Sequence, residues 1–221
     1  MDKLGLMDQL FFKADQYAVA SMIMGGALIL APATARVKLD TKIIADHIAA
    51  RLENVPVMRM KFLQDPLRIG SVRKVEDPNF DVHSHIQLGS IPEPGGYGEL
   101  TAALAAITSS PLGANELWRW TLLDGLEGGR LALACQLHHA LFDGLGAMQA
   151  LSSMYDDKPV KPEKAGGRRQ QAQEEPGPYA MLADAIAEST GRLWRKTPSF
   201  VLDNAVPLVS SLAQGMAGMI G

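Results

Sequence analysis

The chain has 221 residues, of which 47% are hydrophobic and 20% are charged, and its formal net charge is −3. This composition is typical of a folded domain with one substantial core and excludes a disordered chain. The acidic balance, with no basic stripe interleaved with aromatic residues, excludes nucleic acid as a partner, and the single cysteine, Cys135, excludes a disulfide framework and fits a reducing compartment.

An uncharged stretch near the N-terminus, residues 16–35, is nominally long enough to span a bilayer. It contains Gly25-Gly26, Pro32 and several polar residues, which make its transfer into lipid unfavourable. We therefore predict a buried strand from about Ala18 to Leu30, with a glycine bulge, and no membrane helix. The chain does not open with a basic region followed by an apolar core, so no secretory signal is predicted.

Helix and strand patterns alternate in the following segment. Asp40 or Thr41 can cap a helix that runs to about Leu52, because isoleucines then fall on one helical face. Short strands are predicted at 57–63 and 69–75. A layered α/β domain with a mixed sheet follows from this alternation.

Residues 82–88 alternate in polarity and predict a further strand, followed by a helix over 99–107. The strand would place His83 and His85 on one face, which is the geometry of a metal-binding pair. No third ligand lies nearby in the sequence, so the pattern favours a solvated or packed strand face.

The segment with the clearest chemical meaning is His138-His139-Ala140-Leu141-Phe142-Asp143-Gly144, at the exit of a predicted strand over 131–137 and before a helical pattern over 145–155. Three interpretations compete: histidines that only close a strand, a metal site, and a general base. Neighbouring strand residues point to opposite faces, which argues against convergence of His138 and His139 on one metal ion. The same alternation suits a base, because one ring can face a reaction cavity while the other packs.

The last part of the chain changes character. Residues 156–178 are rich in charged residues, proline and glycine and predict a flexible linker, in which Arg168-Arg169 is an exposed protease site. The pattern favours a solvated crossover with no binding role, and contact with CoA phosphates is the alternative. A helix is predicted over 179–196 and an apolar one over 200–220. The latter exposes too much apolar surface for a soluble monomer and therefore predicts a partner.

Several segments together resemble the bacterial wax ester synthase/diacylglycerol acyltransferase family, within the coenzyme A-dependent acyltransferase superfamily. The heptad HHALFDG matches the superfamily signature HHxxxDG. The flanking motifs that carry the family resemblance are LMDQLFF at 6–12, FDVHSHI at 80–86, IPEPGG at 91–96, SPL at 110–112 and LDGLEGGR at 123–130. In order and spacing they cover roughly residues 5–157.

The resemblance implies a chloramphenicol acetyltransferase-like layered fold and direct acyl transfer, with acyl-CoA as cosubstrate and no bound cofactor or metal. By the same resemblance His139 is the general base on the acceptor hydroxyl and His138 assists it or shapes the pocket. Asp143 holds the loop through a salt bridge, and Gly144 allows a tight backbone approach.

Two departures from the family pattern limit what carries over. The Pro-Leu-Trp of the family is Glu116-Leu117-Trp118 here, so a substrate-binding role for Leu117 and Trp118 is weak and a core tryptophan is favoured. A second domain with an Asn-Asp pair is not found. We therefore expect an acyltransferase domain over 1–157, a linker over 158–178 and a helical segment over 179–221 that packs on a C-terminal domain.

The expected function is acyl transfer from acyl-CoA to a long-chain alcohol or a diacylglycerol. This activity is expected to need the C-terminal half of the enzyme as a partner, supplied by the same chain or by a second chain. The expected location is cytoplasmic, with peripheral binding to the inner membrane or lipid inclusions as an open alternative. A noncatalytic lipid-associating half-protein and a superfamily enzyme with a small acceptor are the competing functions.

Overall fold

The computed structural model describes residues 2–17, 21–31, 38–113, 116–142, 144–155 and 175–196. In these ranges the helices are α1 (Leu6–Gln16), α2 (Thr41–Arg51), α3 (Tyr97–Ser109), α4 (Gly144–Ser153) and α5 (Pro178–Lys196). The strands are β1 (Asp2–Lys3), β2 (Ile23–Leu30), β3 (Met60–Leu63), β4 (Arg73–Glu76), β5 (Ile86–Ser90), β6 (Trp118–Leu126) and β7 (Arg130–His138). The mixed α/β fold that the sequence predicts is confirmed.

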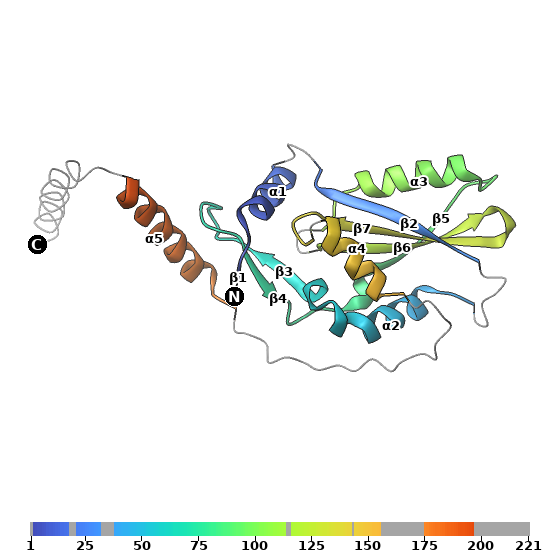
Figure 1. Cartoon of the computed structure of the whole chain (residues 1–221), viewed down its shortest axis with the longest axis horizontal. Coiled ribbons are helices and arrows are strands. Elements are labelled where there is room, and N and C mark those ends of the chain that lie inside the picture. Colours follow the sequence, from blue (N-terminus) through green and yellow to red (C-terminus); the bar gives the residue numbers. More distant parts are fainter. Residues whose placement is uncertain are drawn as a thin grey trace, which may run out of the picture. The chain divides into compact units, whose positions relative to one another are not determined.

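The larger sheet has the strand order β2-β7-β6-β5, in which only β5 and β6 are parallel. Helix α3 covers one face of this sheet, and α2 and α4 lie against the other (Figure 1). Alternate residues of β7 serve the two faces: Leu133 and Leu137 belong to the core with α2 and α4, and Ala132 and Ala134 to the core with α3. The central strand β7 is therefore buried on both faces, where the sequence pattern predicted a half-buried strand.

Strand β2 corrects two other expectations. It begins at Ile23, five residues after the predicted start, and pairs with β7 from Ile23 to Leu30 without a register shift, so Gly25-Gly26 does not form a bulge. It is also an edge strand with half of its residues exposed, and not a buried one. No helix in the described ranges is both long and apolar enough to cross a membrane.

The predicted helix after Asp40 is present as α2, and the Asp40 side chain accepts a hydrogen bond from the Ile43 amide (2.8 Å). The predicted strand over 82–88 is wrong at its start, because Val82–His85 form a 3-10 helix and β5 begins at Ile86. The Asp81 side chain caps this turn by accepting from the His83 amide (2.9 Å).

The chain forms two compact units: one contains β1 to β7 with α1 to α4, and the other contains the loop Gln64–Ser71 and α5. In the second unit, Gly70 faces Ala185 of α5 closely, and the Ser71 hydroxyl donates to Glu188 (2.9 Å). Helix α5 matches the helix predicted over 179–196. The predicted linker residues 158–174, with the Arg168-Arg169 pair, and the predicted helix over 200–220 lie outside the described residues.

Candidate active site

The exit of β7 is held by backbone hydrogen bonds to the residues just before both neighbouring strands, β6 and β2. The His138 amide donates to the Leu117 carbonyl oxygen (2.8 Å), and the His139 amide donates to the Met22 carbonyl oxygen (2.7 Å). Leu117 and Met22 each directly precede a neighbouring strand, so these bonds extend the backbone pairing of the sheet to the two histidines. The histidines therefore lie on rigid backbone at one end of the sheet. A rigid support of this kind is what a positioned catalytic group requires.

His138 is buried, with 4% of its surface exposed. Its Nδ1 accepts a hydrogen bond from the Ala140 amide (3.0 Å), and its ring packs near the rings of Phe12 and Phe62. Burial among these apolar groups lowers the pKa of His138. The ring is thus buried and bonded to the backbone of the turn that follows β7.

His139 is partly exposed, and its ring lies against Phe11 with a centroid distance of 4.6 Å. Its Nδ1 is buried and has no hydrogen-bond partner among the described residues. The nitrogen available to an incoming molecule is therefore Nε2. The alternation expected from the sequence, one packed histidine and one accessible histidine, is present in the structure.

The other residues of the heptad are only partly described. Asp143 lies outside the described residues, so its expected structural role stays a prediction. Gly144 begins α4, which places the start of this helix five residues after His139.

Leu117 and Trp118 are both buried, at 4% and 1% exposure. The Trp118 indole Nε1 donates to the Met58 carbonyl oxygen (2.7 Å), which fixes the ring inside the core. The core interpretation of Trp118 is confirmed, and the structure gives neither side chain an exposed surface for substrate.

The second pair of histidines, His83 and His85, does not share one environment. The His85 ring stacks on Phe80 and on Trp118, and its Nδ1 donates to the Trp118 carbonyl oxygen (2.9 Å). His83 is exposed on the 3-10 helix. The FDVHSHI segment therefore packs on the start of β6, which pairs with β7, the strand that leads to the heptad. In the part of the chain that the structure describes, no three His, Cys, Asp or Glu residues gather in a way that could hold a metal ion.

One residue of the site was not singled out by the sequence. Asp15, in the last turn of α1, has its Oδ2 at 3.7 Å from His138 Nε2, and its Oδ1 accepts from the Met22 amide (3.1 Å). An acidic residue near a helix end is common, and no local pattern reveals a contact across more than 120 residues. Only the tertiary structure shows it.

An apolar pocket of about 390 Å³ lies between α4 and the β2–β7 pair. The strand residues that line it include Met24, Gly26, Cys135 and Leu137, which share one face of the sheet. Leu137 is two residues before His139, a distance of about 7 Å along an extended chain. The pocket therefore ends near the accessible histidine.

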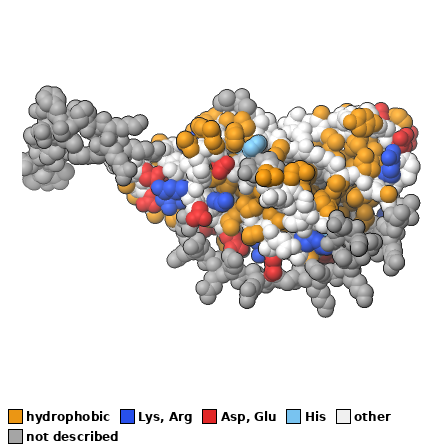
Figure 2. Space-filling view, viewed as in Figure 1, with side chains coloured by type: hydrophobic (Ala, Val, Ile, Leu, Met, Phe, Trp, Pro, Cys, Tyr) orange, Lys and Arg blue, Asp and Glu red, His pale blue; other side chains and the backbone are white. Residues whose placement is uncertain are grey.

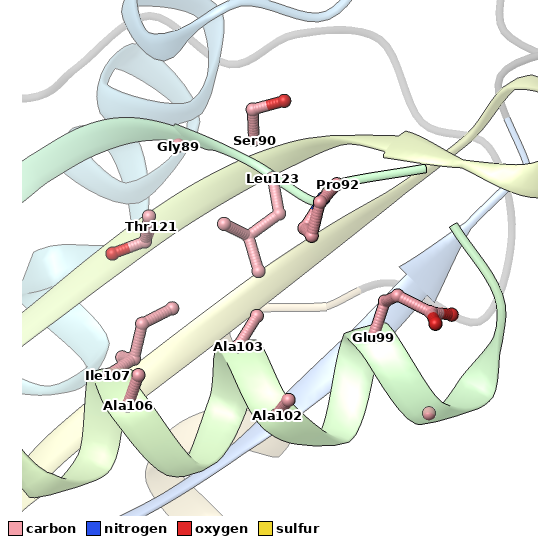
Figure 3. Close-up of a pocket in the computed structure, with 11 residues that line it drawn as sticks. Gly89, Ser90, Pro92, Glu99, Ala102, Ala103, Ala106, Ile107, Thr121 and Leu123 are labelled. Carbon is pink, nitrogen blue, oxygen red and sulfur yellow. The ribbon is translucent and has the colours of Figure 1, made fainter. Parts of the chain in front are cut away.

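A second cavity, of about 540 Å³, lies on the opposite face of the sheet. Figure 3 shows Leu123 of β6 pointing toward Ala103 of α3, with Thr121 and Gly89 on the same side of the sheet. Because β5 and β6 are less fully covered by α3 than β2 and β7 are, the cavity stays open there. It lies on the opposite face of the sheet from the pocket that Cys135 lines.

The surface around the histidines is apolar. Hydrophobic side chains gather over α1 and over α4 (Figure 2). Leu6, Met7 and Leu10 of α1 and Leu145 and Met148 of α4 are each more than half exposed. Since isolated exposed apolar residues are ordinary but gathered ones mark interaction surfaces, these two helices indicate a surface for an apolar partner.

Comparison with known proteins gives the same assignment along nearly the whole chain. The family model described as the wax ester synthase/diacylglycerol acyltransferase catalytic domain matches residues 4–219. A Mycobacterium tuberculosis protein assigned as a diacylglycerol O-acyltransferase is 39% identical over 110 residues, which are 49% of this chain and 23% of that protein.

Two solved structures show the fold. The wax ester synthase/diacylglycerol acyltransferase from Marinobacter aquaeolei VT8 is 24% identical, with a TM-score of 0.51, over 67% of this chain and 37% of that one. A starter condensation domain of rhizomide synthetase, solved as a mutant in complex with C8-CoA, is 13% identical with a TM-score of 0.51, over 68% of this chain and 33% of that one. The matched region thus spans 23% to 37% of the length of these relatives.

Proposed function

The chain belongs to the wax ester synthase/diacylglycerol acyltransferase catalytic domain family, and we propose that it carries the histidine-bearing part of an O-acyltransferase. The proposed reaction moves a fatty acyl group from acyl-CoA to a long-chain alcohol or a diacylglycerol, with His139 as the general base. One observation carries this proposal: a partly exposed histidine lies at the end of the strand face that lines an apolar pocket.

The chemistry needs one positioned imidazole. Nε2 of His139 takes the proton of the acceptor hydroxyl while the oxygen attacks the thioester carbonyl carbon. The tetrahedral intermediate then collapses, the carbon–sulfur bond breaks, and the imidazolium returns the proton to the CoA thiolate. His138 stays neutral in the core and supports the turn.

We assign the pocket between α4 and the β2–β7 pair to an alkyl chain. Its lining is mostly apolar, as in sites that bury a lipid chain. Gly26 leaves it open, because a Cβ at this position would meet nothing within 4 Å. Replacing Gly26 with Leu should therefore shorten the preferred acyl chain, measured as the ratio of rates with hexadecanoyl-CoA and decanoyl-CoA.

The remaining part of the active site is assigned to the C-terminal portion found in longer family members. The exposed apolar residues of α1 and α4, on both sides of the histidines, form the surface on which that portion docks. Acyl-CoA and the acceptor would then meet between the two parts.

The test of the catalytic proposal compares His139→Ala with His83→Ala, a matched removal of an exposed histidine. Each is assayed for ester formation from hexadecanoyl-CoA and hexadecanol or dioleoylglycerol, with and without the separately expressed C-terminal portion of a family member. We expect His139→Ala to lose at least 100-fold in rate and His83→Ala to keep it. An active His139→Ala protein would remove His139 from the mechanism.

A noncatalytic lipid-associating role predicts a different result in this assay. In that case hexadecanoyl-CoA would protect Cys135, on the pocket wall, from alkylation, yet no ester would form in any combination of chains. Measuring both protection and ester formation on the same samples separates the two functions.

A further inference from the structure

Asp15 has an unfavourable place within its own helix. It lies in the last turn of α1, where the backbone carbonyls carry partial negative charge and a carboxylate is therefore destabilising. Its side chain is 30% exposed. The interactions that offset this cost come from outside the helix.

The first such interaction holds the backbone of His139. Asp15 Oδ1 accepts from the Met22 amide (3.1 Å), and the Met22 carbonyl oxygen accepts from the His139 amide (2.7 Å). The carboxylate is thus connected through one residue to the backbone of the proposed base. Displacing Met22 would displace His139.

The second interaction concerns the ring of His138. Since its Nδ1 accepts from the Ala140 amide, the proton of the neutral ring is on Nε2. That atom is buried without a hydrogen-bond partner among the described residues, and Asp15 Oδ2 lies 3.7 Å from it. The distance exceeds that of a hydrogen bond, so the contact is electrostatic.

We propose that Asp15 is a positioning residue for both histidines: through Met22 it fixes the backbone of His139, and through its second oxygen it fixes the orientation of the His138 ring. This inference rests on the proposed function for its catalytic consequence, but its two structural parts can be tested without any activity.

Among the described residues, the His138 ring has neighbours from two elements and from its own strand end. Asp15 and Phe12 face it from α1, Phe62 from β3, and His139 follows it in the chain. The Asp15 carboxylate raises the pKa of His138 against the larger lowering by burial, and His139 lowers it. Loss of the carboxylate charge should therefore move the His138 titration to lower pH.

Two variants separate the two contacts. Asp15→Asn removes the charge but keeps an oxygen that can accept from the Met22 amide, whereas Asp15→Ala removes both. Asp46→Asn, an exposed carboxylate on α2, is the matched control. The readouts are the titration of the histidine rings by NMR, hydrogen exchange of the His139 amide, and kcat and KM in the ester assay.

We expect Asp15→Asn to shift the His138 titration to lower pH with unchanged His139 amide exchange, and Asp15→Ala to accelerate that exchange as well. In the active complex kcat should fall about 100-fold in Asp15→Ala, as expected for a misplaced base, with KM changed little, and Asp15→Glu should recover part of it. Unchanged ring titration and amide exchange in both variants would overturn the inference, as would full kcat in Asp15→Ala. If the unmodified protein forms no ester, but the NMR changes appear, the positioning contacts hold and the proposed function fails.

Discussion

Two adjacent glycines of β2 make a sharp test of the packing described above. A Cβ added at Gly25 would lie 2.4 Å from the Cys135 carbonyl oxygen and 2.7 Å from Thr108 Cγ2, both far inside contact distance. A Cβ added at Gly26 would meet nothing within 4 Å, because it points into the apolar pocket. The two positions share one strand and differ only in the face they present.

The magnitudes follow from this difference. Replacing glycine with alanine inside a strand gains about 0.5–1 kcal/mol from the reduced freedom of the unfolded chain. This gain is common to both positions, so Gly26→Ala should be more stable than the unmodified protein by that amount. Gly25→Ala carries in addition an overpacking cost of about 1–3 kcal/mol, since backbone of β7 would have to move. The two variants should therefore differ by about 1–3 kcal/mol.

The assay is urea unfolding followed by tryptophan fluorescence, which reports on the buried Trp118 and Trp120. Free energies come from the transition midpoints at a common slope. For a protein of this size each 1 kcal/mol corresponds to about 2–4 °C in Tm, so thermal unfolding gives a second measurement. Equal stabilities of the two variants, or a less stable Gly26→Ala, would refute the assignment of these faces.

Three further predictions concern other parts of the site. Because burial lowers the pKa of His138 below its value in the unfolded chain, stability should fall as the pH drops below about 6.5. His138→Gln should weaken this pH dependence, measured as urea midpoints at pH 7.5, 6.5 and 5.5. His83→Gln should leave the pH dependence of the midpoints unchanged. Trp118→Phe should lower the free energy of unfolding in urea by about 1–3 kcal/mol, because the buried Met58 carbonyl oxygen loses its donor. A loss below about 0.5 kcal/mol would contradict this. Burial raises the pKa of the Cys135 thiol, so iodoacetamide should modify it more slowly at pH 8 than in the urea-unfolded chain, and equal rates would contradict a half-buried thiol.

Local sequence patterns determined most elements that lead to the site. Strand β7 and helix α2 with its Asp40 cap follow from alternation and capping, which act over a few residues. The heptad motif also singled out His138 and His139, which the structure places at the exit of β7. These features depend on near neighbours in the chain, and a pattern can therefore report them.

Burial and long-range contacts were decided by the tertiary structure. Whether a strand is central or at an edge depends on its neighbours, which is why β7 is buried on both faces and β2 is not. The same holds for His85, which stacks on Trp118 and so leaves the strand face on which alternation placed it. Asp15 meets His138 only because α1 packs at the end of the sheet, a contact that no local pattern encodes. The sequence by itself determined the histidine pair and the strand that presents it. Only the folded chain decided which ring is buried, which is accessible and which carboxylate lies beside them. These features depend on atoms brought together from distant parts of the chain.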